Sequence, residues 1–227
     1  MKTMGWVKAA LMAAALALPG LAPAARIGVD PTRFSLAYLR SDQTEVYWSA
    51  ALEQILRYYG LEVKQAEIAR SVYGTNPDGS TRTDGGGISI DDAIDSAFKH
   101  WDTDDKGRKF TAAAVRWPTT RYVQPQAPSP RVLQAELSAG RPILALLKLP
   151  QGEQWKSGAA SQVLVDIVII DAADLSVDAD GNPSFKSIEI RNPSITAKNP
   201  RDPGFVTLSP MEYKARISTY WTIQVKR

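Results

Sequence analysis

The apolar residues of this chain change their spacing once, near Arg141. Before Arg141 they recur at the spacing of helical faces, and after it they form short runs of strand length. A chain whose helices precede its strands is typical of the α+β class, in which the helices and the sheet form separate packed layers. We therefore predict an α+β protein with two packed subdomains, the first helical and the second built on a sheet.

Four helices and five strands are expected from the local pattern. The clearest helix spans residues 47–59, because its apolar side chains share one face and Gly60 follows its last turn. The proline-rich residues 118–130 are interpreted as a linker between the halves. The other helices are expected at 65–73, 90–101 and 130–140, and the strands at 143–149, 163–170, 185–191, 205–208 and 220–225.

The first 24 residues have the pattern of a secretory signal peptide. Lys2 and Lys8 precede a short apolar run, and the sequence APA at 22–24 supplies the small residues that signal peptidase accepts. The apolar run is too short to span a bilayer with ease; the alternative is a short uncleaved anchor. We expect a mature single domain of residues 25–227 in the periplasm or outside the cell, without a transmembrane span.

Composition excludes several classes of function. Removing the two lysines of the signal lowers the formal net charge from +3 to +1, and the remaining charges form no block of one sign, which argues against nucleic acid or an anionic membrane as partner. The chain contains no cysteine, so disulfides, thiolate metal sites and a thiol nucleophile are excluded. No cofactor and no metal site are expected.

Four segments, in order along the chain, resemble papain-like cysteine peptidases of the bacterial kind, including the peptidase domains that process double-glycine leader peptides. The resemblance implies a papain-like fold, with a helical lobe over about residues 40–140 packed on an antiparallel sheet lobe over about residues 141–227 and a cleft between them. The segments are YWSAALEQILRYYG (47–60), similar to the nucleophile helix, LEVKQAEIARSVYG (61–74), LQAELSAGRPILALL (133–147) and LSPMEYKARISTYWTIQV (208–225).

The same resemblance implies that the two residues that carry the family's chemistry are missing. The nucleophile position falls on Tyr47, the histidine position on Gln162 at the head of QVLVDIVIID, and the Asp or Asn position on Asn192. Gln43 is the candidate for the oxyanion glutamine, at a shorter spacing than usual. Because a phenol titrates near pH 10 and an amide accepts no proton near neutrality, the activated-nucleophile mechanism is lost.

Other candidate sites have plainer interpretations. Ser49 with the single histidine, His100, would be a non-thiol pair, but His100 falls off the apolar stripe of its helix and is interpreted as a flanking or surface residue. Residues 178–182 hold carboxylates around a glycine that is misplaced for an EF-hand, so a hairpin turn is expected there. The aspartates of residues 102–105 are likewise expected in a solvated turn.

Most aromatic side chains are expected in the core. Only Tyr47 and Trp155 are expected to be exposed, since the resemblance places both at the cleft. The aromatic residues considered are Trp48, Tyr58, Tyr59, Trp101, Trp117, Trp155 and Trp221.

The expected function is that of an exported, non-catalytic pseudopeptidase that binds a peptide or protein partner through Tyr47, Trp155 and Gln162. Two alternatives stay open. One is a hydrolase with a non-thiol site, and the other is a structural component of the envelope with a filled cleft. An open groove favours ligand binding, whereas a groove plugged by Tyr47 favours the structural role.

Overall fold

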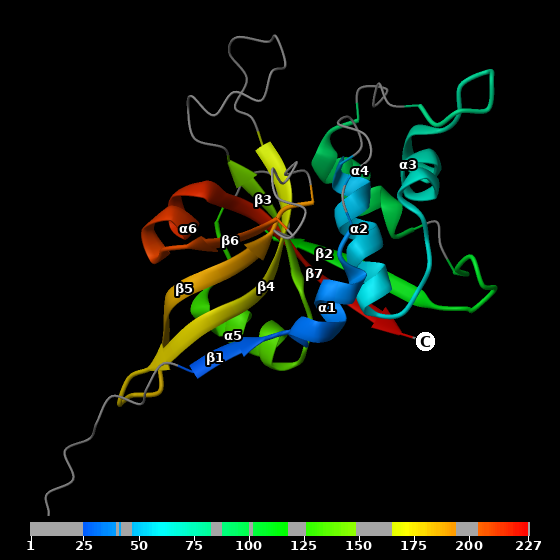
Figure 1. Cartoon of the computed structure of the whole chain (residues 1–227). Coiled ribbons are helices and arrows are strands. Elements are labelled where there is room, and N and C mark those ends of the chain that lie inside the picture. The colour runs from blue at the N-terminus through cyan, green and yellow to red at the C-terminus, as the bar shows by residue number, and fades with distance from the viewer. Residues whose placement is uncertain are drawn as a thin grey trace, which may run out of the picture.

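The computed structural model describes residues 25–39, 41, 47–82, 88–99, 102–117, 126–148, 165–193 and 204–226. These residues form six helices and seven strands (Figure 1). The helices are α1 (Pro31–Ala37), α2 (Tyr47–Tyr58), α3 (Gln65–Tyr73), α4 (Ile90–Ala97), α5 (Pro130–Ser138) and α6 (Pro210–Arg216). The strands are β1 (Ala25–Gly28), β2 (Thr111–Trp117), β3 (Ile143–Lys148), β4 (Val165–Val177), β5 (Pro183–Arg191), β6 (Phe205–Leu208) and β7 (Ile217–Lys226).

All seven strands belong to one antiparallel sheet, in the order β2-β7-β3-β4-β5-β6. β1 also pairs with β4, beyond the part of β4 that pairs with β3. The change of neighbour occurs at Asp171, where the register of β4 against β5 also shifts as in a β-bulge. Gly28 of β1 fits there because a side chain would meet Ala172 at 2.7 Å.

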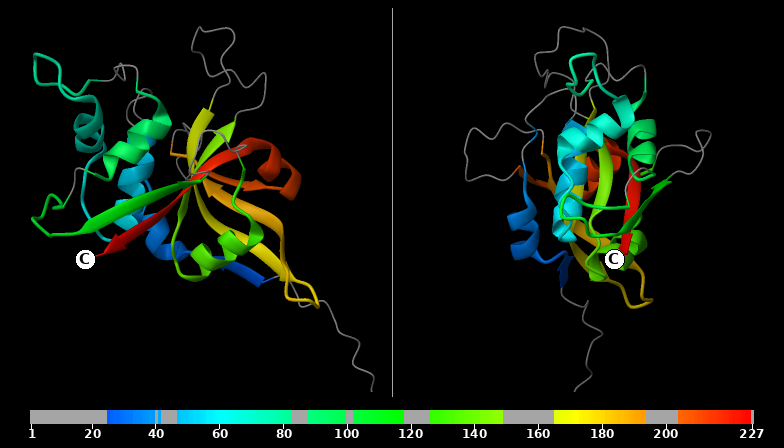
Figure 2. Two further views of the ribbon diagram at one scale, coloured as in Figure 1. Left: turned by 180° about the vertical axis from the view of Figure 1, so that it is seen from behind. Right: turned by 90° about the vertical axis from the view of Figure 1, so that its right-hand side faces the viewer.

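The helices form two groups around this sheet (Figures 1 and 2). α1 to α4 pack against one another, with α2 in contact with β4 and α4 in contact with β2. α5 contacts β1, β4 and β5, while α6 contacts β5, β6 and β7. No helix among the described residues is long and apolar enough to cross a membrane.

The predicted α+β class is confirmed, and the predicted helices and strands are present, although α4 ends at Ala97 rather than near residue 101. α2, α3 and α5 begin at the expected residues, and α4 begins after the Ser89 cap, whose hydroxyl accepts a bond from the backbone N–H of Asp92. α6 opens with a capping box between Ser209 and Glu212. The five expected strands are present, with β4 extended to Val177.

The expected boundary between a helical and a sheet lobe near residue 140 is wrong in two places. β2, within the expected helical lobe, pairs with β7 along its whole length, and α5 packs on the sheet. The sequence of β2, TAAAVRW, is rich in alanine, which is depleted in strands, so its pairing depends on tertiary contact. β1 and α1 were also not predicted, although Asp30 and Pro31 are a typical helix start.

α2 is the central helix of the core. Nearly all of its side chains are buried, including Trp48, Leu52 and Ile55, which have no exposed surface. Such a helix is positioned by packing on all sides rather than by one amphipathic face. Its first residue, Tyr47, is therefore held at a defined place opposite the sheet.

Candidate functional site

The start of α2 meets the start of β4 through Tyr47. The phenolic hydroxyl of Tyr47 donates a hydrogen bond of 2.9 Å to the backbone carbonyl of Val165, 118 residues away. The side chain is half-buried rather than exposed as expected. The bond joins the group of helices to the sheet, and it is made by the residue that the sequence resemblance predicts at the nucleophile position.

The surroundings of Tyr47 favour the neutral phenol. Burial raises its pKa above the ordinary value, and the nearby carboxylate of Asp166 raises it further, as does Tyr73. A protonated phenol is a hydrogen-bond donor and a poor nucleophile. Tyr47 therefore acts as a donor to the sheet.

A buried polar pair lies beside this bond. The side-chain amide of Asn192 donates to the carboxylate of Asp166 at 2.7 Å, and both residues are at most 5% exposed. Asp166 follows Val165 in β4, so the structure brings Tyr47 and Asn192 to the same end of that strand. Sequence reasoning missed Asp166, although it is the one charged residue between Val165 and Ile170.

Asn192 is held by a close backbone contact. Its N–H donates to the carbonyl of Gly204 at 3.0 Å, and a side chain on Gly204 would lie 2.3 Å from the Asn192 carbonyl oxygen. Gly204 also has a positive φ of 69°, which favours glycine. The backbone N–H of Ser41 donates to the carbonyl of Pro193 at 3.1 Å, so the chain after α1 closes the same corner.

Four of the residues proposed from sequence lie outside the described part of the chain: Gln43, His100, Trp155 and Gln162. The place of Gln43, Trp155 and Gln162 near Tyr47 stays a prediction, and so does the surface position of His100. Ser49, the alternative nucleophile, is described and has no exposed surface. A substrate therefore has no access to the Ser49 hydroxyl in this conformation.

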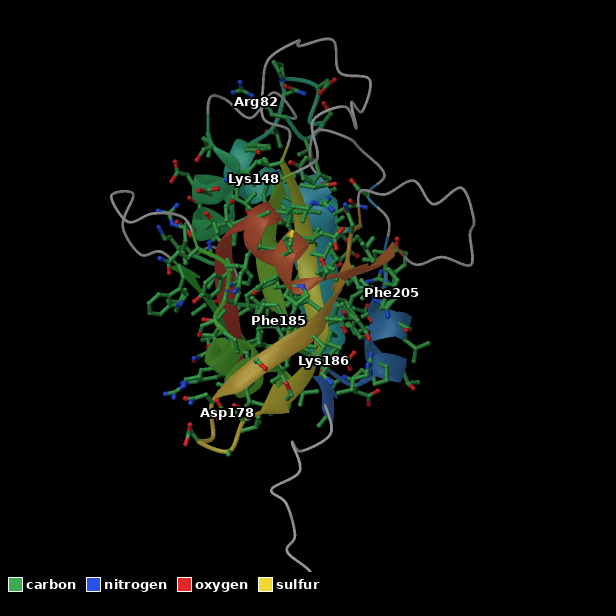
Figure 3. The ribbon with its side chains drawn as sticks, turned by 90° about the vertical axis from the view of Figure 1, so that its left-hand side faces the viewer. Arg82, Lys148, Asp178, Phe185, Lys186 and Phe205 are labelled. Atoms are coloured by element: carbon green, nitrogen blue, oxygen red, sulfur yellow. The ribbon has the colours of Figure 1, made fainter. Side chains whose placement is uncertain are left out.

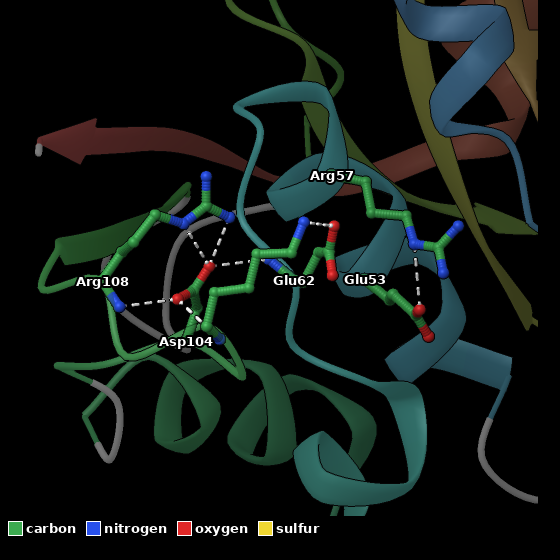
Figure 4. Close-up of polar contacts among 6 residues, drawn as sticks. Glu53, Arg57, Glu62, Asp104 and Arg108 are labelled. Atoms are coloured by element: carbon green, nitrogen blue, oxygen red, sulfur yellow. Dashed lines mark hydrogen bonds and ion pairs between the residues drawn. The ribbon is translucent and has the colours of Figure 1, made fainter.

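A second polar cluster surrounds Asp104 near Glu62, just after the C-terminal end of α2 (Figure 4). The Asp104 carboxylate accepts bonds from the guanidinium of Arg108 and from the backbone N–H groups of Glu62, Lys106 and Arg108. The Arg108 hydrogen bond is the main reason why the pKa of Asp104 lies well below its usual range. The expected solvated turn is confirmed for Asp102 and Asp105, which are exposed, but is wrong for Asp104, which is only 6% exposed.

Residues 178–182, which include Asp178 and Asp180, form the predicted turn of the β4–β5 hairpin. The Asp178 carboxylate accepts bonds from the N–H groups of Asp180 and Asn182, and Gly181 has a positive φ of 81°. Figure 3 shows Asp178 at one end of the sheet and Lys148 toward the other. Since Lys148 pairs with Val165, this turn lies far from the Tyr47 corner.

Comparison with known proteins gives only weak similarities. No protein-family model and no curated protein matches the chain. Among solved structures, the peptidase domain of Streptococcus ComA, a bifunctional ABC transporter involved in quorum sensing, is 12% identical at a TM-score of 0.43, covering 83% of this chain and 96% of that one. SERA5E from Plasmodium falciparum is 12% identical at a TM-score of 0.48, and the match covers 87% of this chain and 93% of that one.

Proposed function

We propose that this protein is an exported, non-catalytic relative of papain-like peptidases that binds a peptide or protein partner in the cell envelope. The observation that carries the proposal is the hydrogen bond from Tyr47 to Val165, at the position that the sequence resemblance assigns to the nucleophile. The chain has no cysteine to take that role. Tyr47, Asp166 and Asn192 include neither a thiol nor an imidazole.

The chemistry of this corner argues against catalysis by an activated nucleophile. Activation of a nucleophile requires a base that exchanges a proton with it near neutrality. The Tyr47 phenol has a raised pKa and already donates to a backbone carbonyl. The burial of Ser49 argues against the alternative of a non-thiol hydrolase.

A structural component of the envelope with a filled cleft is the second candidate. The Tyr47 bond favours it too, because the hydroxyl links α2 directly to β4 and occupies part of the space between them. The two candidates differ in whether residues 155 and 162 contact another molecule.

The catalytic claim is tested with the purified protein. It is expected to hydrolyse no peptide or ester and to remain unlabelled by thiol-directed inhibitors. Hydrolysis that survives purification and disappears in the Ser49→Ala variant would show that the protein is an enzyme and would overturn the proposal.

Partner binding is tested by photocrosslinking in intact envelopes. Variants with a photoreactive residue at position 155 or 162 are expected to form a defined adduct. The same residue at Met211, which is 80% exposed on α6, is the matched control and is expected to form none. Adducts at neither 155 nor 162 would favour the structural component instead.

A further inference from the structure

β1 begins at the residue that follows the predicted cleavage site. The leader ends with the small residues APA at 22–24, and β1 runs from Ala25 to Gly28. β1 pairs antiparallel with β4, with Ala25 opposite Leu175 and Gly28 opposite Ala172 (Figure 1). The ends of a chain are usually poorly ordered unless a strand or a helix ties them down. The first residues of the predicted mature chain are therefore part of the sheet.

The side chain of Arg26 ties β1 to a second strand. Its Nε donates a hydrogen bond of 3.0 Å to Oε1 of Glu189, and its Nη2 donates to Oε2 of the same carboxylate. Glu189 belongs to β5, which lies on the other side of β4 from β1. Two parallel charge-assisted bonds fix both the distance and the orientation of the two groups. β1 is thus held by backbone pairing with β4 and by an ion pair that crosses β4.

The end of β1 leads directly into the core. The N–H of Val29 donates to the carbonyl of Asp171 at 2.9 Å, and Val29 is only 4% exposed. Ile27 packs against the same core. Gly28 lies so close to β4 that an added Cβ would be 2.7 Å from the Cβ of Ala172. β1 therefore has one close-fitting place on β4.

We infer that signal peptidase and the sheet compete for β1, so that the leader is removed before β1 joins β4, and a precursor that folds first keeps its leader. The inference rests on the proposed export of this protein. Removal of the leader is hydrolysis of the peptide bond between residues 24 and 25. Water supplies the hydroxyl of the new carboxyl group on residue 24 and a hydrogen of the new amino group on Ala25.

The competition comes from backbone pairing and not from burial. Ala25 and Arg26 are exposed, but both are paired with β4. A protease acts on a segment that is locally open, and the rate of cleavage follows the population of the open form when opening and closing are fast. Each contact that holds β1 on β4 should therefore slow the removal of the leader from a folded precursor.

The first test compares two orders of addition with the whole precursor, residues 1–227. The precursor in urea is diluted into detergent micelles that already contain signal peptidase, or it folds there before the enzyme is added. Cleavage is expected to be at least about tenfold slower in the folded precursor, because β1 must first open. Equal rates in the two orders would overturn the inference alone. No cleavage in either order would overturn the proposed export and the inference with it.

The second test loosens β1 without changing the leader or β1 itself. Glu189→Ala removes the partner of Arg26 and is expected to speed cleavage of the folded precursor about fivefold. Lys186→Ala removes an exposed charge from the same strand and is the matched control, which should keep the natural rate (Figure 3). Both variants should match the natural chain when the enzyme is present from the start. Equal rates for the two folded variants would contradict the role of the ion pair.

The third test removes the close fit of β1. In Gly28→Val the new side chain would meet Ala172, so β1 should leave the sheet and the precursor should be cleaved nearly as fast after folding as before it. Circular dichroism checks that the rest of the protein is folded, and Glu189→Ala carries the test if it is not. A folded Gly28→Val precursor that is cleaved as slowly as the natural one would overturn the inference.

Discussion

Two polar clusters near α2 are built in different ways. The Asp104 cluster joins residues that are mostly four or fewer apart, and the carboxylate accepts bonds from neighbouring backbone N–H groups and from Arg108. The Tyr47 corner joins α2, the start of β4 and the end of β5, with partners 118 and 26 residues apart. The first cluster mainly stabilises one loop, whereas the second joins elements that are far apart in the sequence.

The comparison shows that the two clusters depend on different parts of the fold. The Asp104 cluster mainly orders residues 104–108, and it also joins that loop to Glu62, 42 residues earlier in the chain. A corner assembled from distant segments exists only when the whole sheet is in register, so its polar groups depend on packing elsewhere. The predictions below test this difference, from the largest expected effect to the smallest.

Gly204→Ala is expected to destabilise the protein by about 3–5 kcal/mol, because the new methyl group would lie 2.3 Å from the Asn192 carbonyl oxygen and the positive φ adds strain. Gly79→Ala is the matched control. Gly79 has a φ of 83° but no atom within 4 Å of the position of an added Cβ. The Gly79→Ala variant should therefore lose only about 1–2 kcal/mol of stability. Urea unfolding measures both, and equal losses would contradict a close contact at Asn192.

Asn192→Asp is expected to cost about 2–4 kcal/mol at neutral pH, because it places a second buried carboxylate against that of Asp166. Protonating one carboxyl relieves the repulsion, so the loss should shrink as the pH falls. Asn182→Asp is the control, since Asn182 also donates to a carboxylate but is exposed. There the cost should stay under about 1 kcal/mol; a similar cost at both positions would contradict the burial of the corner.

Asp104→Asn is expected to cost stability with the same direction of pH dependence, but for a different reason. The lowered pKa of Asp104 means that its charge stabilises the folded state above the ordinary pKa of about 3.9, and this stabilisation is lost as the pH falls. The variant should thus be less stable than the natural protein at neutral pH, and the difference should narrow in acid. Thermal unfolding across pH measures this, with the exposed Asp180→Asn as control. A difference that does not narrow in acid would exclude the charge as the cause.

Tyr47→Phe is expected to destabilise the protein by about 1 kcal/mol, the worth of one ordinary hydrogen bond. Tyr58→Phe is the matched comparison, because the Tyr58 hydroxyl donates to the Gly140 carbonyl at the same distance of 2.9 Å. Tyr58 is only 5% exposed, so its loss should cost more than that of the half-buried Tyr47. A larger loss at Tyr47 would show that its hydroxyl does more than join α2 to β4.

Sequence reasoning predicted the strongly periodic elements and missed those that depend on context. α2 and α3 were found because apolar spacing and a following glycine define them locally. β2 was missed because an alanine-rich segment has no strong intrinsic preference for a strand, and β7 supplies the pairing that makes it one. Asp166 was missed because a charged residue in an apolar run has no visible partner until the strands are paired.

The sequence by itself determined the α+β class, the helices and strands with clear periodicity, and the absence of a thiol, because each depends on residue identity and near neighbours. Only the tertiary structure decided that Tyr47 donates to Val165, that Asn192 donates to Asp166, and that β2 is the outermost strand beside β7 among the described strands. Contacts between residues far apart in the chain depend on strand order and register, and neither of these can be read from a single sequence.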